Sequence, residues 1–391
     1  VVDRLLTLFP ELRIEHEGTD KAYRLTAKIP ALETAGTAPG GILWRYFADD
    51  EVLAPPMAAM ERAAALKRGS LSRSAVQSLY GERISMSASR VERLRSCHFA
   101  YFMEYGLKAK ARRAAAFDAP QIGTFLHYLL EHVTKDVLDR GGFAAVGEED
   151  LHALVRRYIE QYAAEVLQNL EGRNARFRYL FARLRNTAYA VVDQIAEEMR
   201  CSDFVPLAFE LSFGERGELP AVTVSEPDAE LRIGGKVDRV DGWEHDGRLY
   251  LRVVDYKTGR KTFDLTDIWN GMGLQMLLYL FTLEREGEAL YNREIIPSGV
   301  LYLPARDAVV AGSRAMSEAE RRRKVDAELR RRGIVLDEPE VLAAMEEPGE
   351  AGIRFLPVKV NKAGAITGEA LVSAERLGKL ARHTGRILEE I

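Results

Sequence analysis

Two short apolar segments of the chain carry acidic residues and a lysine whose spacing could support catalysis. The first segment contains Asp238, and the second contains Asp255-Tyr-Lys257. Between them lies Asp246-Gly247, and an Asp-Gly pair is a strong signal for a two-residue hairpin turn. A turn centred there makes the two segments antiparallel and places Asp238 opposite Asp255, with their Cβ atoms roughly 5 Å apart.

Two carboxylates held this close repel each other unless a cation lies between them. Lys257 stands two residues after Asp255, so the two-residue period of a strand places its ammonium group on the same face. Two acids and a lysine on paired strands indicate a metal-dependent phosphodiesterase site. The same residues also suit an ordinary surface hairpin with solvated charges, and these segments alone do not separate the two interpretations.

A helical pattern that carries a histidine precedes these strands. It includes Gly123, and its apolar stripe continues to about Arg140. His127 and Glu131 lie four residues apart and share one face of this helix. His127 could therefore offer an imidazole, while Glu131 adds a carboxylate or a supporting hydrogen bond. A purely structural histidine is the alternative.

A third polar pair follows the lysine. The apolar segment after Trp269 predicts a helix that places Gln275 and Tyr279 one turn apart. Both side chains can donate hydrogen bonds to phosphate oxygens or orient a catalytic group. Taken alone, this pair also fits an amphipathic helix with two polar residues at its edge.

The four motifs follow one another as Gly123-x-x-x-His127, Gly235-x-Val-Asp238-Arg-Val-Asp241, Asp255-Tyr-Lys-Thr-Gly259 and Gln275-x-x-x-Tyr279. In this order they resemble the RecB-like branch of the PD-(D/E)XK nucleases, and more closely the C-terminal nuclease domain of the AddB family of helicase-nuclease subunits. Ser85–Glu92 and Cys97–Leu107 resemble that family's entry to the domain. The resemblance runs from about Leu79 to the end of the chain, whereas any one motif alone would be weak evidence.

The resemblance implies a role for each matched residue. It assigns His127, Asp238, Asp255 and the backbone carbonyl of Tyr256 as metal ligands, and Lys257 as the catalytic lysine. Oxygen atoms and one imidazole suit Mg²⁺ or Mn²⁺ rather than a thiophilic metal. The lysine would position the attacking water or neutralise charge that develops on the phosphate.

Three more residues receive supporting roles. Gln275 and Tyr279 match the fourth motif, and they would orient the lysine or the strand being cut. Glu210 lies in Phe209-Glu-Leu-Ser-Phe213 and is expected to assist from outside the set of metal ligands.

The activity that the resemblance implies is a Mg²⁺-dependent deoxyribonuclease, an exonuclease acting on single-stranded DNA ends. It would work beside an AddA-type helicase-nuclease subunit in the processing of double-strand breaks for recombinational repair. Two alternatives remain: a catalytically silent scaffold that only binds DNA, and a stand-alone exonuclease of the CRISPR-adaptation or phage type. No Gly-x-x-x-x-Gly-Lys-Ser/Thr motif is present, so ATP hydrolysis would have to come from a partner.

The cysteines depart from the family pattern. The resembled family binds a 4Fe-4S cluster through one cysteine before the nuclease helices and three near the end of the chain, and Cys97 matches the first. The other three have no counterpart, so we expect the cluster in a full-length protein but not in this chain, which would be truncated before the cysteine group. Cys201 is expected to be a partly buried free thiol.

The overall charge does not indicate a DNA-binding protein, since the net charge is −4 and the isoelectric point is about 6.1. Contact with DNA must therefore use local basic patches. The strongest candidate interleaves arginines with Phe177, Tyr179 and Phe181, a combination that can stack bases and bind phosphates. Its arginines are Arg173, Arg176, Arg178, Arg183 and Arg185.

Two further basic groups are weaker candidates. The first consists of Lys108, Lys110, Arg112 and Arg113. The second consists of Arg321 to Lys324 with Arg330 to Arg332. Acidic residues are interspersed in the second group, which therefore favours a solvated helix over a DNA contact.

The predicted fold is α/β, with a restriction-endonuclease-like core in which helices flank a mixed sheet, and with a helical N-terminal elaboration. Residues 1–84 would be a flanking region, the tail of a helicase-derived domain with a short strand-like start. Residues 85–391 would form the nuclease domain, with a charged insertion near 307–352. No segment approaches the roughly 20 apolar residues of a membrane span, and no secretory signal pattern opens the chain, so we expect a cytoplasmic protein without membrane contact.

Overall fold

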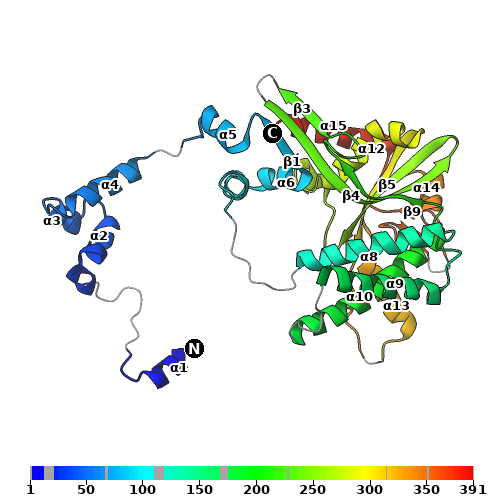
Figure 1. Cartoon of the computed structure of the whole chain (residues 1–391), viewed down its shortest axis with the longest axis horizontal. Coiled ribbons are helices and arrows are strands. Elements are labelled where there is room, and N and C mark those ends of the chain that lie inside the picture. The colour runs from blue at the N-terminus through cyan, green and yellow to red at the C-terminus, as the bar shows by residue number, and fades with distance from the viewer. Residues whose placement is uncertain are drawn as a thin grey trace. The chain divides into compact units, whose positions relative to one another are not determined.

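The computed structural model describes residues 2–12, 22–66, 69–109, 119–167, 175–226, 229–313, 315–349 and 352–390. Backbone contacts divide the chain into two units, Val1–Ala75 and Val76–Ile391, whose elements are labelled in Figure 1. None of the helices among the described residues combines the length and the apolar character that crossing a membrane requires.

The first unit is helical around a small core. Its segments are α1 (Val2–Leu8), a 3-10 turn (Ala22–Thr26), α2 (Lys28–Gly36), α3 (Ile42–Phe47) and α4 (Ala54–Ala65). The core consists of Ala35, Trp44, Leu53 and Met57. The predicted strand-like start is wrong, because Val2–Leu8 is a helix. Isolated apolar runs this short do not distinguish strand from helix.

The second unit begins near α5 (Arg73–Tyr80) and contains all the motif residues. Its N-terminal helices are α6 (Ala88–Ser96), α7 (His98–Tyr101), α8 (Ala119–Asp139), α9 (Glu148–Tyr162) and α10 (Ala175–Arg200). Single π-helical turns follow α7 at Phe102–Gly106 and α9 at Ala163–Leu167. The later helices are α11 (Leu265–Trp269), α12 (Gln275–Tyr291), α13 (Glu318–Leu329), α14 (Pro339–Met345) and α15 (Ala374–Glu389).

The strands form one mixed sheet in the order β1-β4-β5-β6-β7-β10, and β2 and β3 also pair with β4. Their bounds are β1 (Arg83–Ser87), β2 (Val205–Phe213), β3 (Val222–Glu226), β4 (Ala229–His245), β5 (Arg248–Lys257), β6 (Glu294–Pro304), β7 (Arg332–Leu336) and β10 (Leu371–Val372). A separate two-stranded ribbon joins β8 (Lys359–Val360) and β9 (Ile366–Thr367). Parallel and antiparallel pairs coexist, since β5 runs parallel to β6 but antiparallel to β4. The predicted α/β fold with a mixed sheet is confirmed.

The long strand β4 and its neighbour β5 form the hairpin that the Asp-Gly pair predicts. Pairing runs from His245 with Arg248 to Arg239 with Val254, which is the predicted register. Asp246 and Gly247 both have positive φ, 48° and 76°. A two-residue turn needs this left-handed backbone at both positions so that its twist matches that of the strands.

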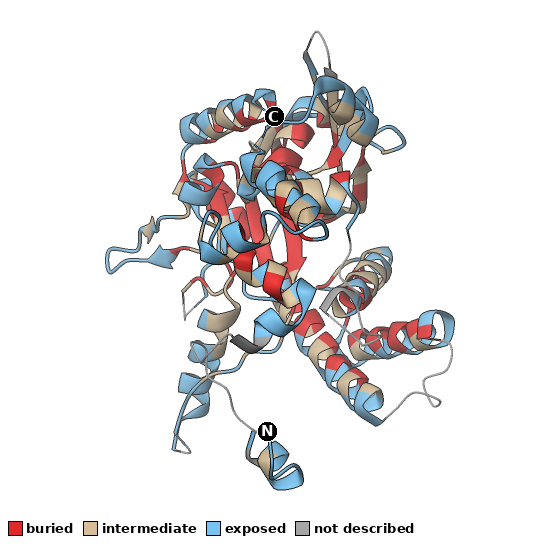
Figure 2. Ribbon diagram, turned by 90° about the vertical axis from the view of Figure 1, so that its left-hand side faces the viewer, coloured by how far each residue is buried: buried red, intermediate tan, exposed pale blue. Residues whose placement is uncertain are grey.

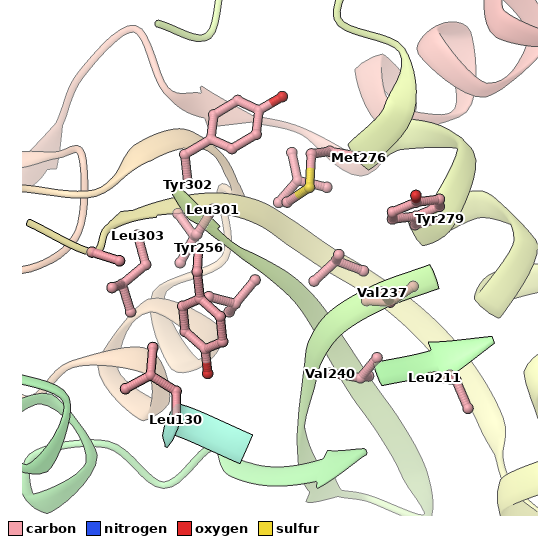
Figure 3. Packing of buried hydrophobic residues seen from close by; sticks show 14 of the residues in the cluster. Leu130, Leu211, Val237, Val240, Tyr256, Met276, Tyr279, Leu301, Tyr302 and Leu303 are labelled. Atoms are coloured by element: carbon pink, nitrogen blue, oxygen red, sulfur yellow. The ribbon is translucent and has the colours of Figure 1, made fainter. Parts of the chain in front are cut away.

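Helices cover both faces of the sheet, with α8, α9 and α10 on one side and α12 and α15 on the other (Figure 1). Buried residues concentrate along the central strands and on the helix faces turned toward them (Figure 2). Tyr256 and Leu130 lie on one side of the strands, while Tyr302 and Met276 lie on the other (Figure 3). The buried stripe of α8 follows the helical period that its sequence predicts, and consists of Phe125, Leu126, Leu129, Leu130, Val133 and Val137.

The segment 307–352, for which the sequence suggests a charged insertion, contributes to the core. It contains β7, which pairs antiparallel with β6 in the main sheet. It also contains Arg331, whose side chain is fully buried. The polar composition of this segment therefore does not mean that all of it lies outside the fold.

A fully buried ionic cluster joins the sheet to α10. Asp241 on β4 accepts hydrogen bonds from Arg239 at 3.0 Å and from Arg252 of β5 at 2.9 Å. Glu198 on α10 accepts from Arg252 at 3.4 Å and from Arg331 at 2.5 Å. Burial raises the pKa of Glu198, but the guanidinium groups of Arg331, Arg252 and Arg239 outweigh burial and hold it below its ordinary value. Glu198 is therefore held in its ionised form, and the two carboxylates are shared among three arginines.

Removing one acid from this cluster should destabilise the fold. In Glu198→Gln the buried guanidinium of Arg331 loses its carboxylate partner, which should lower the free energy of unfolding by about 3–5 kcal/mol. Glu197→Gln is the matched control: its carboxylate also binds two arginines, Arg322 and Arg354, but is 36% exposed, and its loss should cost about 0–1 kcal/mol. Urea denaturation followed by circular dichroism measures both values. Equal losses in the two variants would contradict the argument.

Candidate active site

Four elements bring the predicted site residues together. His127 comes from α8, Glu210 from β2, Asp238 from β4 and Asp255 from β5. The His127 Nδ1 atom lies 3.4 Å from Asp238 Oδ1 and 3.5 Å from Glu210 Oε1. One ligand atom from each of these three residues lies within 4.8 Å of the others. An imidazole and two carboxylates converging in this way form a donor set that suits a hard divalent cation.

Glu210 reaches this group through long-range strand pairing. β2 pairs with β4 so that Phe209 faces Arg239 and Leu211 faces Val237, which places Glu210 opposite Asp238. The backbone of Glu210 has a positive φ of 52°, a conformation that costs a non-glycine residue about 1–2 kcal/mol. Its carboxylate also lies 2.6 Å from Lys236 Nζ. The sequence predicts a role for Glu210 outside the set of ligands, but its carboxylate lies almost as close to His127 as that of Asp238, which makes Glu210 a further candidate ligand.

Asp238 lies next to the last paired residue of the hairpin. The pairing of β4 with β5 ends at Arg239 and Val254, and the Asp238 carboxylate then accepts a hydrogen bond from the Tyr256 backbone N–H at 2.8 Å. This carboxylate therefore takes the position of a ladder carbonyl and is fixed relative to β5. The Tyr256 side chain is buried, and its hydroxyl accepts a hydrogen bond from Arg239 at 3.4 Å. Tyr256 thus links the site to the buried ionic cluster.

Asp255 and Lys257 form an ion pair on one face of β5, with 2.5 Å between the lysine Nζ and Asp255 Oδ2. The Asp255 side chain is only 4% exposed. Burial and the Asp238 carboxylate raise the pKa of Asp255 to about 6, and Lys257 opposes that shift. The predicted arrangement of two acids and a lysine on one face is therefore present, and its negative charge is only partly compensated.

His127 carries much of the remaining compensation. Burial lowers its pKa, but hydrogen bonds with the carboxylates of Asp238 and Glu210 outweigh burial and raise the pKa to about 10. Without a bound cation, His127 is thus an imidazolium between two acids. A metal ion held here would require the neutral imidazole, so binding would release a proton.

Gln275 and Tyr279 begin α12, as the sequence predicts. The Gln275 side-chain amide donates to the Tyr279 hydroxyl at 2.9 Å, and the Gln275 backbone N–H donates to Glu92 at 3.2 Å. Tyr279 is buried, and its hydroxyl also accepts a hydrogen bond from the Lys236 backbone. A Cβ atom at Gly235 would lie 2.8 Å from the Tyr279 ring, which explains the glycine in the second motif. Tyr279 therefore supports β4 beside Asp238.

Glu131 faces the same hollow as His127 but has a different partner. The hollow has a volume of about 450 Å³ and is also lined by Gly123, Thr124, Tyr128 and Glu210. Glu131 forms an ion pair with Lys135 at 2.7 Å, one turn along α8. The sequence suggests that Glu131 could assist His127. In the structure its carboxylate pairs with Lys135, a contact that the four-residue spacing along a helix favours equally.

The arginines predicted to bind DNA are exposed along the first half of α10, and they are Arg176, Arg178, Arg183 and Arg185. Arg173 lies outside the described residues. Of the interleaved aromatic residues, Phe181 is buried against Phe125 at 5.6 Å, whereas Tyr179 is 63% exposed. The expected stacking surface is therefore reduced, because the helical period turns Phe181 into the core. Of the first basic group, Lys108 is exposed, and Lys110, Arg112 and Arg113 lie outside the described residues.

The two cysteines have different surroundings. Cys97 is exposed at the start of α7, where its sulfur accepts the Ala100 backbone N–H at 3.5 Å. Cys201 is half-buried after α10, and its thiol donates to the Glu197 carbonyl at 3.3 Å. The prediction that Cys201 is a partly buried free thiol is confirmed.

Comparison with known proteins agrees with this geometry. A profile of the PD-(D/E)XK nuclease superfamily matches residues 85–351. The B subunit of the ATP-dependent helicase/deoxyribonuclease from Clostridium perfringens is 30% identical over all of this chain and 36% of its own length. The proteins of the same name from Acetivibrio thermocellus and Caldanaerobacter subterraneus are 31% and 33% identical over 82% and 74% of this chain, and over 28% and 25% of their own lengths. The chain thus spans about a third of the length of the first relative.

The two thiols should differ in reactivity with pH. Burial, with the nearby carboxylates of Glu346 and Glu198, raises the pKa of Cys201 to about 11. Because the thiolate is the reactive form, alkylation of Cys201 should be slow at pH 8 and should accelerate about tenfold per pH unit until the pH approaches that value. Exposed Cys97 should be modified first. Mass spectrometry after timed iodoacetamide treatment measures both rates, and equal modification at pH 8 would contradict the expectation.

Proposed function

Because the chain belongs to the PD-(D/E)XK nuclease superfamily, we propose that the site hydrolyses phosphodiester bonds of DNA with a divalent cation, Mg²⁺ or Mn²⁺. The observation that carries this proposal is the convergence of His127, Glu210 and Asp238 beside the Asp255–Lys257 ion pair. The proposed ligands are His127, Asp238, Asp255 and the Tyr256 carbonyl, and we add Glu210 to them.

The residues of the chain would divide the chemistry between them. A bound divalent cation supplies Lewis acidity at the scissile phosphate. Lys257 is 31% exposed and is held by Asp255, so its ammonium can donate to a phosphate oxygen where negative charge develops. Gln275 and Tyr279 hold the strand that carries Asp238, which limits the movement of the carboxylate during reaction.

The proposed substrate and partner rest on the names of the relatives. Each of these relatives is named as one subunit of an ATP-dependent helicase/deoxyribonuclease. We propose that this chain is the nuclease portion of such a subunit, an exonuclease that acts on single-stranded ends delivered by an AddA-type helicase-nuclease partner. Break processing for recombinational repair in the cytoplasm is the proposed setting. In a subunit as long as these relatives, Cys97 would be one ligand of a 4Fe-4S cluster.

Cleavage of a labelled single-stranded oligonucleotide with Mg²⁺ or Mn²⁺ tests this function. Lys257→Met and Asp255→Asn should each lower the cleavage rate about 100-fold or more, because each removes a group that acts on the reacting phosphate or its cation. Glu244→Gln is the matched control, since Glu244 is exposed on the same strand as Asp238, and it should retain the parent rate. Metal-dependent cleavage that survives in both site variants would contradict the assignment.

Glu210 can be tested separately as a ligand. Titration of Mn²⁺ followed by electron paramagnetic resonance should show about 10- to 100-fold weaker binding in Glu210→Gln than in the parent. Glu244→Gln should bind Mn²⁺ like the parent. Unchanged affinity in Glu210→Gln would show that Glu210 contributes to metal binding neither as a ligand nor as a support for one, whatever its effect on cleavage.

A further inference from the structure

A strongly basic cavity adjoins the proposed catalytic lysine. It has a volume of about 220 Å³, and its lining includes one carboxylate, that of Glu328. The cationic side chains that line this basic cavity are Lys257, Arg260, Lys261, Arg306, Arg330 and Arg332. A surface hollow with so large an excess of one sign of charge concentrates ions of the opposite sign.

Three distant segments build the basic cavity. The loop after β5 provides Arg260 and Lys261, the end of β6 leads to Arg306, and the segment from α13 to β7 provides Arg330 and Arg332. The sequence favours a solvated helix for the basic group that includes these last two arginines. In the structure, the residues of that basic group fall into two sets with different surroundings. Arg321 and Lys324 form ion pairs along α13, whereas Arg330 and Arg332 face the basic cavity.

The positive charge of the basic cavity is not compensated within it. Glu328 Oε1 accepts hydrogen bonds from both Arg260 at 2.7 Å and Arg306 at 2.8 Å, so one carboxylate serves two guanidinium groups. Arg330 is held by neutral backbone carbonyls, those of Ile353 at 3.0 Å and Val358 at 3.4 Å.

Two exposed cations of the basic cavity, Lys261 and Arg332, have no carboxylate partner among the described residues. Both side chains belong to exposed residues. An anionic ligand can therefore bind Lys261 and Arg332 without breaking an ion pair.

Tyr302 connects the basic cavity to the proposed catalytic lysine. Its ring, from a residue that is only 4% exposed, lies 5.7 Å from Lys257 Nζ and 5.8 Å from Lys261 Nζ. Contact with the same ring favours an ordered position for both ammonium groups. Because both lysines line the basic cavity and contact one ring, a ligand with several anionic groups can bind both, whereas a single small anion bound at Lys261 would leave Lys257 to another ligand.

We propose that the basic cavity binds an internal phosphodiester of the strand being cut, adjoining the scissile one, through Lys261, Arg332 and the guanidinium groups around Glu328. The proposal rests on the proposed nuclease function, because that function makes the ligand of Lys257 a phosphate. Arginine and lysine are the side chains that bind nucleic-acid phosphates, and charge alone gives contacts independent of base sequence. The basic cavity would therefore hold the backbone in register with the reacting bond.

Binding of a single-stranded oligonucleotide in EDTA, measured by fluorescence anisotropy across a range of NaCl concentrations, tests this without cleavage. The double variant Lys261→Gln/Arg332→Gln should bind about three- to tenfold more weakly at low salt. It should also lower the slope of log K against log[NaCl] by about 1.4, since each lost contact with a single strand contributes about 0.7. With metal, KM should rise by a similar factor while kcat is retained.

Arg293→Gln is the matched control. Arg293 directly precedes β6, whereas Pro304 at the other end of β6 lines the basic cavity, and an 11-residue strand separates its ends by about 33 Å. This variant removes one positive charge, compared with two in the double variant, at a site far from the basic cavity, and it should keep the affinity, slope and KM of the parent. The double variant contains only exposed positions, and circular dichroism checks that it is folded.

The outcomes separate the two proposals. If the double variant binds with the affinity and slope of Arg293→Gln while the parent cleaves DNA, the basic cavity is refuted and the nuclease function stands. If the parent does not cleave but the slope falls in the double variant alone, the nuclease function fails and a DNA-binding cavity remains. In the double variant, oligonucleotides with and without a terminal phosphate should lose affinity by the same factor relative to the parent. A loss confined to terminally phosphorylated strands would overturn an internal phosphodiester in favour of a strand end.

Discussion

Repulsion between carboxylates on neighbouring strands is the constraint around which this protein is built. Glu210, Asp238 and Asp255 lie on three adjacent strands, where their charges would drive the strands apart. Three cationic side chains offset that repulsion: the His127 imidazolium from α8 lies between Asp238 and Glu210, Lys236 pairs with Glu210, and Lys257 pairs with Asp255. The proton of the His127 imidazolium can be released. A metal ion bound among these carboxylates could then supply the positive charge that the proton had supplied.

On the opposite face of the same strands, the charged side chains are buried and paired with one another. Because side chains alternate along a strand, Arg239 and Asp241 point away from Asp238 and into the interior. There they form a cluster with Arg252, Glu198 and Arg331 in which the charges are buried and paired. Tyr256 contacts both systems, through its backbone N–H to Asp238 and its hydroxyl to Arg239. Tyr256 therefore links the Asp238 carboxylate of the candidate site to the buried cluster through two hydrogen bonds.

Charge is also distributed unevenly over the larger unit. The chain is acidic overall, with a net charge of −4, yet cations gather in the basic cavity and on the exposed face of α10. Several other lysines and arginines form ion pairs with nearby acids, as in the pairs Lys135–Glu131 and Arg321–Glu318. Overall composition consequently says little about the ligand of such a protein, because association depends on local potential rather than on the sum of charges.

Local signals in the sequence were sufficient for the hairpin and its register, since the turn residues Asp246-Gly247 and the two-residue strand period act within a short stretch of chain. The helix that presents His127 and the Gln275–Tyr279 pair were predictable for the same reason. The closeness of Glu210 to His127 could not be predicted from such local signals, because only the pairing of β2 with β4 brings Glu210 opposite Asp238.

The remaining features depended on contacts between segments far apart in the chain. Glu198 and Arg331 are 133 positions apart, and no local pattern shows that either is buried. Phe181 belongs to the core rather than to a stacking surface because α10 packs against α8. The basic cavity likewise exists only where three segments meet. Sequence alone determined the elements and the chemistry that each carries, because turn geometry and periodicity are local; tertiary structure decided which charges meet, because pairing across long separations is set by the packing of the whole core.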